Sequence, residues 1–282
     1  MPTFSAPDGT ELAYHLVGEG AGEPLVCLPG GPMRASAYLG DLGGLAELRP
    51  LVRLDLRGTG DSAVPADPAS YRCDRQVADV EALREHLGLE QMDLLAHSAA
   101  GDLALLYAAA HPRRVRTLTL VTARGRALGV DFTQEHRRAA ALLRSGEPWF
   151  DAAFASYEAV WADTATDEDW DAVDRFFYGR WDAAVQAHAA SAMDQCNDEA
   201  GDAYATADAF DPAATRAAVA GLDARVLVLA GELDGGPLPR VAAEIAALIP
   251  HNELIVQPGA GHFPWLDDPS WFSATVAAFL KG

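Results

Sequence analysis

Lysine is almost absent from this sequence: Lys281 is the only one, and arginine supplies the rest of the positive charge. The 282-residue chain has 21 Lys and Arg residues against 41 Asp and Glu residues, a formal net charge of −20 at pH 7. A surface so poor in positive charge repels phosphate backbones and anionic lipid head groups. The composition therefore argues against a nucleic-acid partner and against binding to an anionic membrane.

Cysteines and long apolar runs are also scarce. The 3 cysteines, Cys27, Cys73 and Cys196, are too scattered for a disulfide framework or for metal-ligand spacing, so no metal site is expected. No apolar run reaches the roughly 18 residues of a transmembrane helix. The first residues lack the basic and apolar segments of a signal peptide. We expect a cytoplasmic protein without a membrane partner.

Hydrophobic residues make up 50% of the chain and follow a regular order. Short apolar runs, typical of strands buried on both faces of a parallel sheet, alternate with segments of helical periodicity. This alternation predicts an α/β fold with a mostly parallel central sheet flanked by helices. The alternation stops after Arg124 and resumes after Gly221, and the segment between them is rich in alanine and has helical patterns. We therefore expect a core domain of residues 1–124 and 221–282 and a helical cap domain of residues 125–220.

The predicted elements have these bounds. Strands are expected over 11–17, 24–28, 51–56, 92–96, 115–121, 225–230 and 254–256. Helices of the core are expected over 37–48, 74–87, 102–110, 239–248 and 270–280, and helices of the cap over 137–143, 149–161, 170–181 and 213–220.

The stretch from Met92 to Gly101 joins a buried strand to an apolar helix through a short turn with Ser98 at its tip. Such a turn exposes a serine hydroxyl above the sheet and directs the N–H groups of the helix toward it. Small residues are needed around the serine because the neighbouring backbones approach closely. Here they are Ala96 and Ala100, where glycine is usual. By itself the stretch fits a nucleophile elbow and an ordinary turn with a helix-capping serine equally well.

Two more reactive residues come directly after predicted strands. Ligands of open α/β sheets bind beyond the carboxyl ends of the strands, so these positions point to a site. Asp234 follows the penultimate predicted strand, with Glu232 as a competing acid, and His262 follows the last one. Each could alone be a plain turn or surface residue. The order Ser, Asp, His nevertheless predicts Ser98 as nucleophile, His262 as general base and Asp234 as the acid that orients it.

Acyl transfer also needs N–H donors where a tetrahedral oxyanion forms. The residue after the nucleophile, Ala99, supplies one. The Gly-rich loop at 29–32 follows an early strand and supplies the other; since proline has no N–H, the donor is one of its two glycines, and Gly31 is preferred over Gly30. Gly30 and His97 are expected to contribute weakly to substrate binding.

The predicted cap is acidic and rich in tryptophan. Residues 125–220 contain 18 acidic and 7 basic residues, a net charge of −11. Aromatic linings are typical of ligand pockets, although each tryptophan can equally hold the small helices together. We expect weak substrate contacts from Trp149, Trp161, Trp181 and Glu199. The charge favours neutral or cationic substrates with an apolar body, amine-bearing ones included.

These motifs resemble the α/β-hydrolase superfamily, and most closely its proline iminopeptidase-like branch. The HGGPG loop of that branch corresponds to LPGGPM at 28–33, which has proline for the histidine and methionine for the last glycine. Its DxRGxGxS motif is matched by DLRGTGDS at 55–62, and its GHSxGG elbow by AHSAAG at 96–101. Its GxxD and GxGH motifs are matched at 231–234 and 259–262. The similarity covers the core on both sides of the insertion.

The resemblance implies an α/β-hydrolase fold with a helical cap inserted after the sixth strand. It implies a serine hydrolase that cleaves an ester or amide of a small molecule or short peptide through an acyl-enzyme, without cofactor or metal. We expect a monomer or small homo-oligomer. Three alternatives stay open: a true proline iminopeptidase, a lyase or carbon–carbon-bond hydrolase on the same triad, and a slow ligand-binding protein on this fold.

Overall fold

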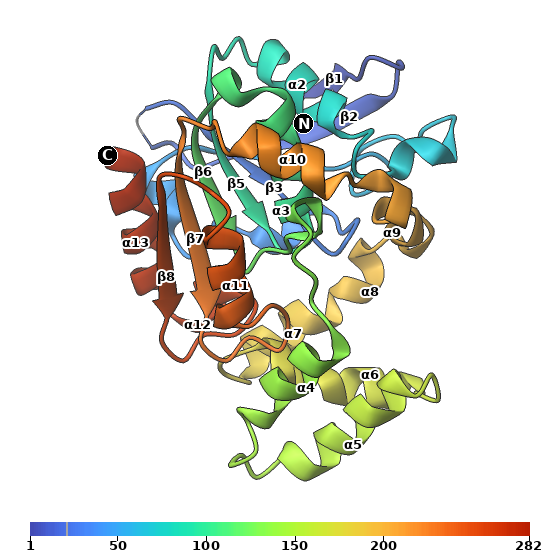
Figure 1. Cartoon of the computed structure of the whole chain (residues 1–282). Helices are drawn as coiled ribbons and strands as arrows, with labels where there is room; N and C mark the ends of the chain where they lie inside the picture. Colours follow the sequence, from blue (N-terminus) through green and yellow to red (C-terminus); the bar gives the residue numbers. More distant parts are fainter. Residues whose placement is uncertain (21) are drawn as a thin grey trace.

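A computed structural model describes residues 1–20 and 22–282. At its centre lies an eight-stranded sheet with the strand order β1-β2-β4-β3-β5-β6-β7-β8. Strand β2 pairs antiparallel with β1 and β4, and the other neighbouring strands are parallel, with helices on both faces (Figure 1). The strands are β1 (Thr3–Ser5), β2 (Glu11–Val17), β3 (Leu25–Leu28), β4 (Leu51–Leu54), β5 (Met92–His97), β6 (Val115–Val121), β7 (Arg225–Gly231) and β8 (Asn252–Gln257).

The central strands are covered by apolar layers on both faces. All residues of β5 are buried, and successive side chains point to opposite faces, so Leu94 belongs to one apolar cluster and Leu95 to the other. The first cluster includes residues of α2 (Val77–His86), α3 (Ala100–Ala110) and α11 (Pro239–Ala246), and the second includes residues of α1 (Leu45–Leu48), α12 (Pro264–Asp267) and α13 (Pro269–Lys281).

The predicted helix over 37–48 is wrong. The structure has a 3₁₀ turn, η1 (Ser36–Leu39), followed by glycine-rich turns and only then α1. Gly40, Gly43 and Gly44 have φ values of 56°, 66° and 83°, a conformation that cannot continue a right-handed helix. Strand β8 is longer than the strand predicted over 254–256. The prediction is too short because the residues at the start of this edge strand are exposed and do not continue its apolar pattern.

The segment between β6 and β7 contains helices and no strand in the described chain. Helices α4 to α6 extend away from the sheet, whereas α9 and α10 lie beside the core (Figure 1). Helix α10 contacts α3, and the Tyr204 hydroxyl donates to the Ala99 carbonyl at 3.3 Å. The last part of the predicted cap therefore packs on the core, and the boundary at residue 220 stays a prediction. These helices are α4 (Gln134–Leu142), α5 (Phe150–Trp161), α6 (Asp167–Val173), α7 (Ala183–Ala190), α8 (Ala192–Gln195), α9 (Asp198–Tyr204) and α10 (Pro212–Val219).

The helix predicted over 170–181 is mostly absent. Helix α6 ends at Val173 and continues as a 3₁₀ turn, η5 (Asp174–Phe177). The side chain of Phe176 is fully buried in an aromatic cluster with Phe150 and Tyr157. This cluster gives the outer helices of the insertion an apolar core of their own.

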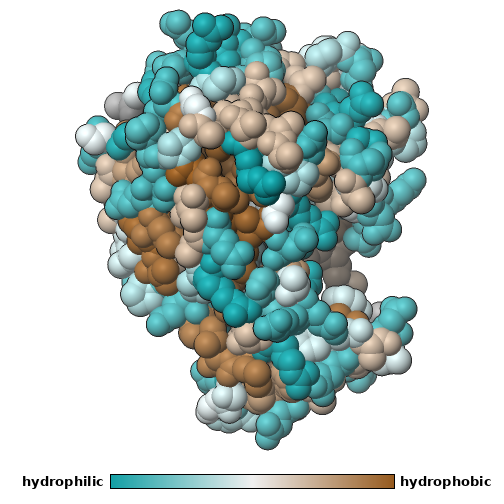
Figure 2. Space-filling model, viewed as in Figure 1, coloured by the Kyte–Doolittle hydropathy of each residue, from teal (hydrophilic) through white to brown (hydrophobic). Residues whose placement is uncertain are grey.

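The surface is mainly hydrophilic, as the net charge suggests. Figure 2 shows hydrophobic areas on this face over the edge strand β8, where Leu254 and Val256 are exposed. Among the described residues, no helix combines the length and the apolar character needed to span a bilayer.

Candidate active site

Ser98 lies in the short turn between β5 and α3, and its backbone is strained. Its φ of 55° is in the left-handed region, which costs a residue with a side chain about 1–2 kcal/mol. Its N–H donates to the Val121 carbonyl at 3.0 Å, and its carbonyl accepts from the N–H groups of Gly101 and Arg124, both at 2.9 Å. The bonds with Val121 and Arg124 tie the turn to the end of β6, and the bond from Gly101 closes the turn onto the start of α3, so that all three hold Ser98 in this conformation.

The two alanines of the elbow are packed into the core. Ala96 and Ala100 are fully buried in the larger apolar cluster. The close approach occurs at Gly101 instead, where an added Cβ would lie 2.7 Å from atoms of the segment that follows β6. Gly30 approaches the turn from the other side, since a Cβ there would lie 2.9 Å from the Cβ of Ser98. Position 101 therefore needs glycine, whereas position 100 accepts a methyl group.

The Asp234 carboxylate holds the ring of His262. The His262 Nδ1 lies 3.0 and 3.1 Å from the two carboxylate oxygens of Asp234, which is fully buried. The Gly236 N–H donates to the same carboxylate at 2.6 Å. Because a carboxylate only accepts, Nδ1 donates in this contact, which leaves Nε2 as the ring nitrogen that can accept a proton. The competing acid, Glu232, is exposed and accepts from the Gly259 N–H instead.

Ser98 and His262 line the same cavity, which has a volume of about 220 Å³. Within residues 1–20 and 22–282, no hydrogen bond joins the Ser98 hydroxyl to the His262 ring. Such bonds are often long in ligand-free sites and tighten when the substrate binds. The fold thus brings all three predicted triad residues to one sheet edge, with one of the two side-chain contacts formed.

The N–H groups predicted for an oxyanion hole differ in availability. In the described part of the chain, those of Gly31 and Ala99 donate to no protein acceptor. The Gly30 N–H, by contrast, donates to the Tyr38 hydroxyl at 2.7 Å. A substrate oxygen could therefore accept from Gly31 and Ala99, and Gly30 is already occupied.

His97 takes part in a chain of hydrogen bonds between the Gly-rich loop at 29–32 and the loop that carries His262. Burial lowers the pKa of His97 well below its usual range, so the ring is neutral. Its Nε2 donates to the His262 carbonyl at 2.9 Å, and its Nδ1 therefore accepts from the Tyr38 hydroxyl at 2.7 Å. Because Tyr38 also accepts from Gly30, one chain of hydrogen bonds links the Gly-rich loop, the elbow and the His262 loop.

The residues predicted to make weak substrate contacts do not line the cavity beside Ser98. Trp149, Trp161 and Trp181 pack on Phe or Tyr rings of the insertion, with ring centroids between 4.5 and 5.5 Å apart. Glu199 is exposed on α9. Neither these four side chains nor Gly30 and His97 are among the described residues that line the cavity.

Comparison with known proteins identifies the family of the chain. The family described as "alpha/beta hydrolase fold" matches residues 23–269. The chain belongs to the α/β hydrolase fold family. The predicted fold class is thereby confirmed.

Individual relatives of this α/β-hydrolase chain are esterases and proline iminopeptidases. It is 40% identical over 117 residues to a proline iminopeptidase of Lactobacillus helveticus, and this match spans only about two-fifths of each chain (40%). The solved proline iminopeptidase of Mycobacterium smegmatis has a TM-score of 0.74 at 24% identity, covering 99% of this chain and 98% of that one. An esterase from Exiguobacterium antarcticum has a TM-score of 0.74 at 20% identity, covering 99% of both. The predicted resemblance is confirmed, and the structural matches show the fold.

The hydrolase-fold cavity contains charged residues that the sequence did not reveal. Arg34, Arg124, Arg137 and Asp174 line it together with Ser98. Arg124 follows β6 at the edge where the predicted triad residues lie, a position that could have singled it out. The other three belong to loops and helices whose distance from that edge depends on the fold.

This lining also disagrees with the expected preference for cationic substrates. Three arginines and one aspartate line the cavity, although the insertion as a whole carries a net charge of −11. Burial raises the pKa of Asp174 to about 6, and the nearby Asp171 adds to this shift. The negative charge of the insertion therefore does not set the charge of the cavity.

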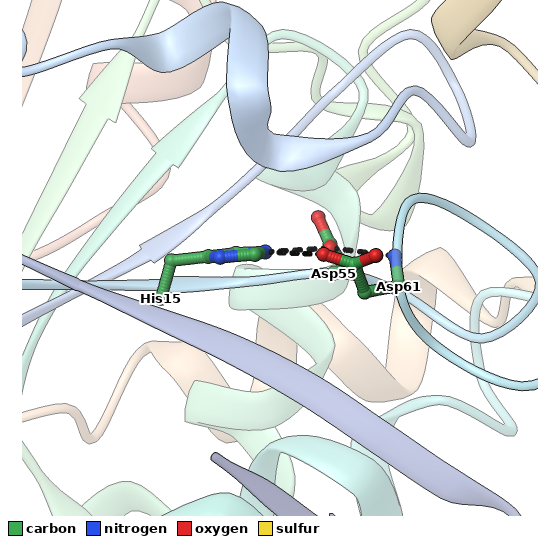
Figure 3. A group of neighbouring side chains, drawn as sticks. All are labelled: His15, Asp55 and Asp61. Carbon is green, nitrogen blue, oxygen red and sulfur yellow. Dashed lines mark hydrogen bonds and ion pairs between the residues drawn. The ribbon is translucent and has the colours of Figure 1, made fainter. Parts of the chain in front are cut away.

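Asp55 of the DLRGTGDS segment lies in a cluster with His15 and Asp61 (Figure 3). This is the single group of metal-ligand residue types found among the described residues. The buried Asp55 carboxylate accepts from the Ser36 N–H at 2.8 Å, from His15 at 2.9 Å and from the Asp61 N–H at 3.0 Å. Burial would raise its pKa, but these N–H donors together hold it below the usual value. Its oxygens are already satisfied, so the cluster is a structural tie between β2, β4 and the loop after β4.

Proposed function

We propose that this chain is a serine hydrolase that cleaves an ester or amide bond of a small substrate by acyl transfer. Ser98 would be the nucleophile, His262 the general base and Asp234 the acid that orients it. The observation that carries the proposal is the Nδ1 contact of His262 with the buried Asp234, at 3.0 Å, on the wall of the cavity that Ser98 also lines. The Nε2 atom of His262 is then the acceptor for the Ser98 proton.

The proposed reaction has two halves. His262 Nε2 takes the proton of the Ser98 hydroxyl while its oxygen attacks the substrate carbonyl, and the N–H groups of Gly31 and Ala99 donate to the oxyanion. His262 then gives the proton to the leaving group as the bond to it breaks, which leaves an ester on Ser98. Water repeats these steps, releases the acid and restores the serine.

The hydrogen-bond chain through Tyr38 and His97 supports this geometry. It connects the loop that carries Gly31 to the loop that carries His262, so the oxyanion donor and the base keep a fixed distance. A displacement of about 1 Å can cost about a hundredfold in rate. We infer that Tyr38 and His97 are positioning residues of the proposed site.

The insertion completes the proposed site from outside the sheet. Arg137 and Asp174, which line the cavity, belong to the segment between β6 and β7. We propose that the helices of residues 125–220 act as a cap, with α4, η5, α7 and α8 covering the cavity and α9 and α10 anchored on the core.

The test is a Ser98→Ala variant assayed with p-nitrophenyl acetate and labelled with a fluorophosphonate. We expect wild type to turn over the ester and to be labelled once per chain, and the variant to lose at least about a thousandfold in kcat and all labelling. Unchanged turnover in the variant would contradict the proposed role of Ser98. Circular dichroism and the urea midpoint of both proteins control for folding.

A second candidate is removal of N-terminal proline, favoured by the 40% identity to a proline iminopeptidase. That activity requires an acid to bind the substrate's free amine, and Asp174 is the one carboxylate among the described residues lining the cavity. Turnover of proline β-naphthylamide, compared with that of proline p-nitrophenyl ester and p-nitrophenyl acetate, decides between the two. An Asp174→Asn variant should lose the proline amide activity if this candidate is right.

A further inference from the structure

Arginine is concentrated where the rest of the molecule would not suggest it. The chain has 41 acidic against 21 basic residues, yet Arg34, Arg124 and Arg137 line the cavity beside Ser98 with Asp174 as the single acid. In the described structure none of these three guanidinium groups has a carboxylate oxygen within 4.0 Å. The cavity is thus a positive site inside a negative protein.

Arg124 is fixed next to the proposed nucleophile. Its backbone N–H donates to the Ser98 carbonyl at 2.9 Å, so its side chain starts directly beside the elbow. Burial lowers its pKa, and its side chain makes no hydrogen bond within the described residues. The charge of the buried Asp102 opposes this lowering, but the Asp102 carboxylate accepts from the Ala127 N–H at 2.9 Å and, in the described structure, forms no ion pair with Arg124. A partly buried cation without a partner is costly, and a bound anion would remove that cost.

Arg137 approaches from α4. Its guanidinium carbon lies 4.8 Å from the ring centroid of Phe132, and its side chain also donates no hydrogen bond among the residues described. Arg124, Phe132 and Arg137 line the main cavity and, together, a narrow recess of about 10 Å³ beside it. Two planar guanidinium groups are therefore available at one end of the site.

Arg34 has a different role. Its Nε donates to Gln195 at 2.9 Å, and its Nη2 donates to Ser191 at 2.9 Å and to the His188 carbonyl at 3.1 Å. These bonds fasten the loop after β3 to α7 and α8. Arg34 is used to hold the insertion, whereas Arg124 and Arg137 keep their donors free for a ligand.

We propose that the substrate carries a carboxylate a few carbon atoms from the scissile carbonyl, and that Arg124 and Arg137 bind this carboxylate. The inference rests on the proposed function and names its substrate class. Guanidinium groups bind carboxylates through paired hydrogen bonds, which fix the orientation as well as the position of the ligand. The cavity of about 220 Å³ is below the roughly 300–1,000 Å³ of pockets for drug-sized ligands, so the substrate is small.

The test compares three p-nitrophenyl esters of similar size: the glutarate monoester, which is anionic, its methyl ester, which is neutral, and the 4-aminobutyrate ester, which is cationic. We expect kcat/KM for the anionic ester to exceed that of the other two by about tenfold or more. 4-Acetoxybenzoate and its methyl ester, compared in the same way, place the carboxylate on the leaving group. If the anion is preferred in just one of the two pairs, that pair shows where the substrate carries its carboxylate: on the acyl group for the glutarate esters, or on the leaving group for 4-acetoxybenzoate.

Arg124→Gln and Arg137→Gln variants locate the effect. Each variant should raise KM for the preferred anionic ester about tenfold or more and should change KM for the neutral ester by less than about threefold. Arg138→Gln is the matched control, because Arg138 is the next residue of α4 and pairs with Glu158 on the surface at 2.8 Å, away from the cavity lining. Arg124→Lys should recover part of the loss. An equal effect of all variants on anionic and neutral esters would overturn the proposal.

Asp174→Asn provides the reciprocal change. At pH 8 the Asp174 carboxyl is ionised and repels a bound carboxylate, since burial brings its pKa only to about 6. The variant should therefore raise kcat/KM for the anionic ester several-fold relative to the neutral one. A fall in that ratio would contradict the proposal and favour an amine-binding role.

Binding measurements separate this inference from the proposed function. Calorimetry with monomethyl glutarate, an anion, and dimethyl glutarate, which is neutral, measures binding without turnover. Monomethyl glutarate should bind to wild type and to Ser98→Ala but not to Arg124→Gln. If Ser98 is not labelled by the fluorophosphonate while the anion still binds, the proposed hydrolysis fails and the carboxylate site stands. If both glutarates bind equally or neither binds, the carboxylate site is refuted whatever the esterase activity.

Discussion

At the scale of single residues, the contact between Asp234 and His262 leaves no room for a side chain at position 236. Gly236 donates to the Asp234 carboxylate at 2.6 Å, and a Cβ on Gly236 would lie 2.8 Å from His262 Nδ1 and 2.9 Å from an Asp234 oxygen. Contacts below 3.0 Å force a shift of one partner. The absence of a side chain at 236 is therefore a condition for the contact between Asp234 and His262.

Gly236→Ala should lower kcat for p-nitrophenyl acetate by about 10- to 100-fold, because the methyl group pushes the imidazole away from the carboxylate. The measurement is steady-state kinetics together with fluorophosphonate labelling rate. Gly221→Ala is the matched control, since the nearest atom to its added Cβ would lie 3.8 Å away. Wild-type kinetics in Gly236→Ala would show that the loop has room to adjust.

At the scale of elements, the backbone of the insertion contacts the loops that carry the proposed triad residues Asp234 and His262. The Gly235 N–H donates to the Phe176 carbonyl at 2.9 Å, and the His262 N–H donates to the Phe177 carbonyl at 2.7 Å. The turn η5 of the insertion thus binds both the loop after β7 and the loop after β8. The position of the outer helices and the geometry of the proposed triad are therefore coupled.

Phe176→Ala tests this coupling. Phe176 is fully buried, and its ring centroid lies 5.0 Å from that of Tyr157 and 5.2 Å from that of Trp149. Truncation of a buried Phe typically costs about 3–5 kcal/mol. We expect faster hydrogen exchange in α5 and a lower kcat, with little change in β5 and β6.

The exposed Trp170 on α6 supplies the control, because Trp170→Ala removes an aromatic ring from the outer helices of the insertion without opening the aromatic cluster around Phe176. If Phe176→Ala loses protection from hydrogen exchange in α5 but keeps its kcat, the outer helices of the insertion and the proposed triad are independent.

For the molecule as a whole, the balance of charges makes stability depend on pH. Burial raises the pKa of Asp102 to about 6, although the Ala127 N–H and Arg124 oppose the shift. A folded-state pKa above the unfolded value of 3.8 means that the folded protein binds the proton more tightly. Stability from this group is gained as pH falls from about 6 toward 4 and is lost as pH rises through that window. A decreasing net negative charge acts in the same direction.

Asp102→Asn should separate the two contributions. The amide keeps an oxygen for the Ala127 N–H and removes the ionisation. The variant should therefore be more stable than wild type by about 2–3 kcal/mol at pH 8 and by only about 1 kcal/mol near pH 4.5. Urea denaturation at both pH values measures it. Asp202→Asn, which removes an equal charge from an exposed position, should show no such pH-dependent difference. A parallel shift of both variants would assign the effect to net charge alone.

The sequence determined the class of fold and the positions of Ser98, Asp234 and His262 along the chain. It could do so because buried parallel strands have a local apolar pattern, and because reactive residues that follow such strands must meet at one edge of the sheet. The elbow was the ambiguous part, because the close approach of backbones that selects glycine at 101 and not at 100 is a contact between distant segments.

Only the tertiary structure decided the character of the cavity. Composition made the insertion acidic, but which of its side chains line the cavity depends on how its helices pack on the core. Arg137 and Asp174 of the insertion line it beside Arg124 of the core, and the predicted tryptophans do not. The tie between Gly30, Tyr38, His97 and the His262 carbonyl is likewise invisible in the sequence, because it joins residues up to 165 positions apart. Local patterns fix strands and turns, whereas a binding site is made of contacts that exist only after the chain has folded.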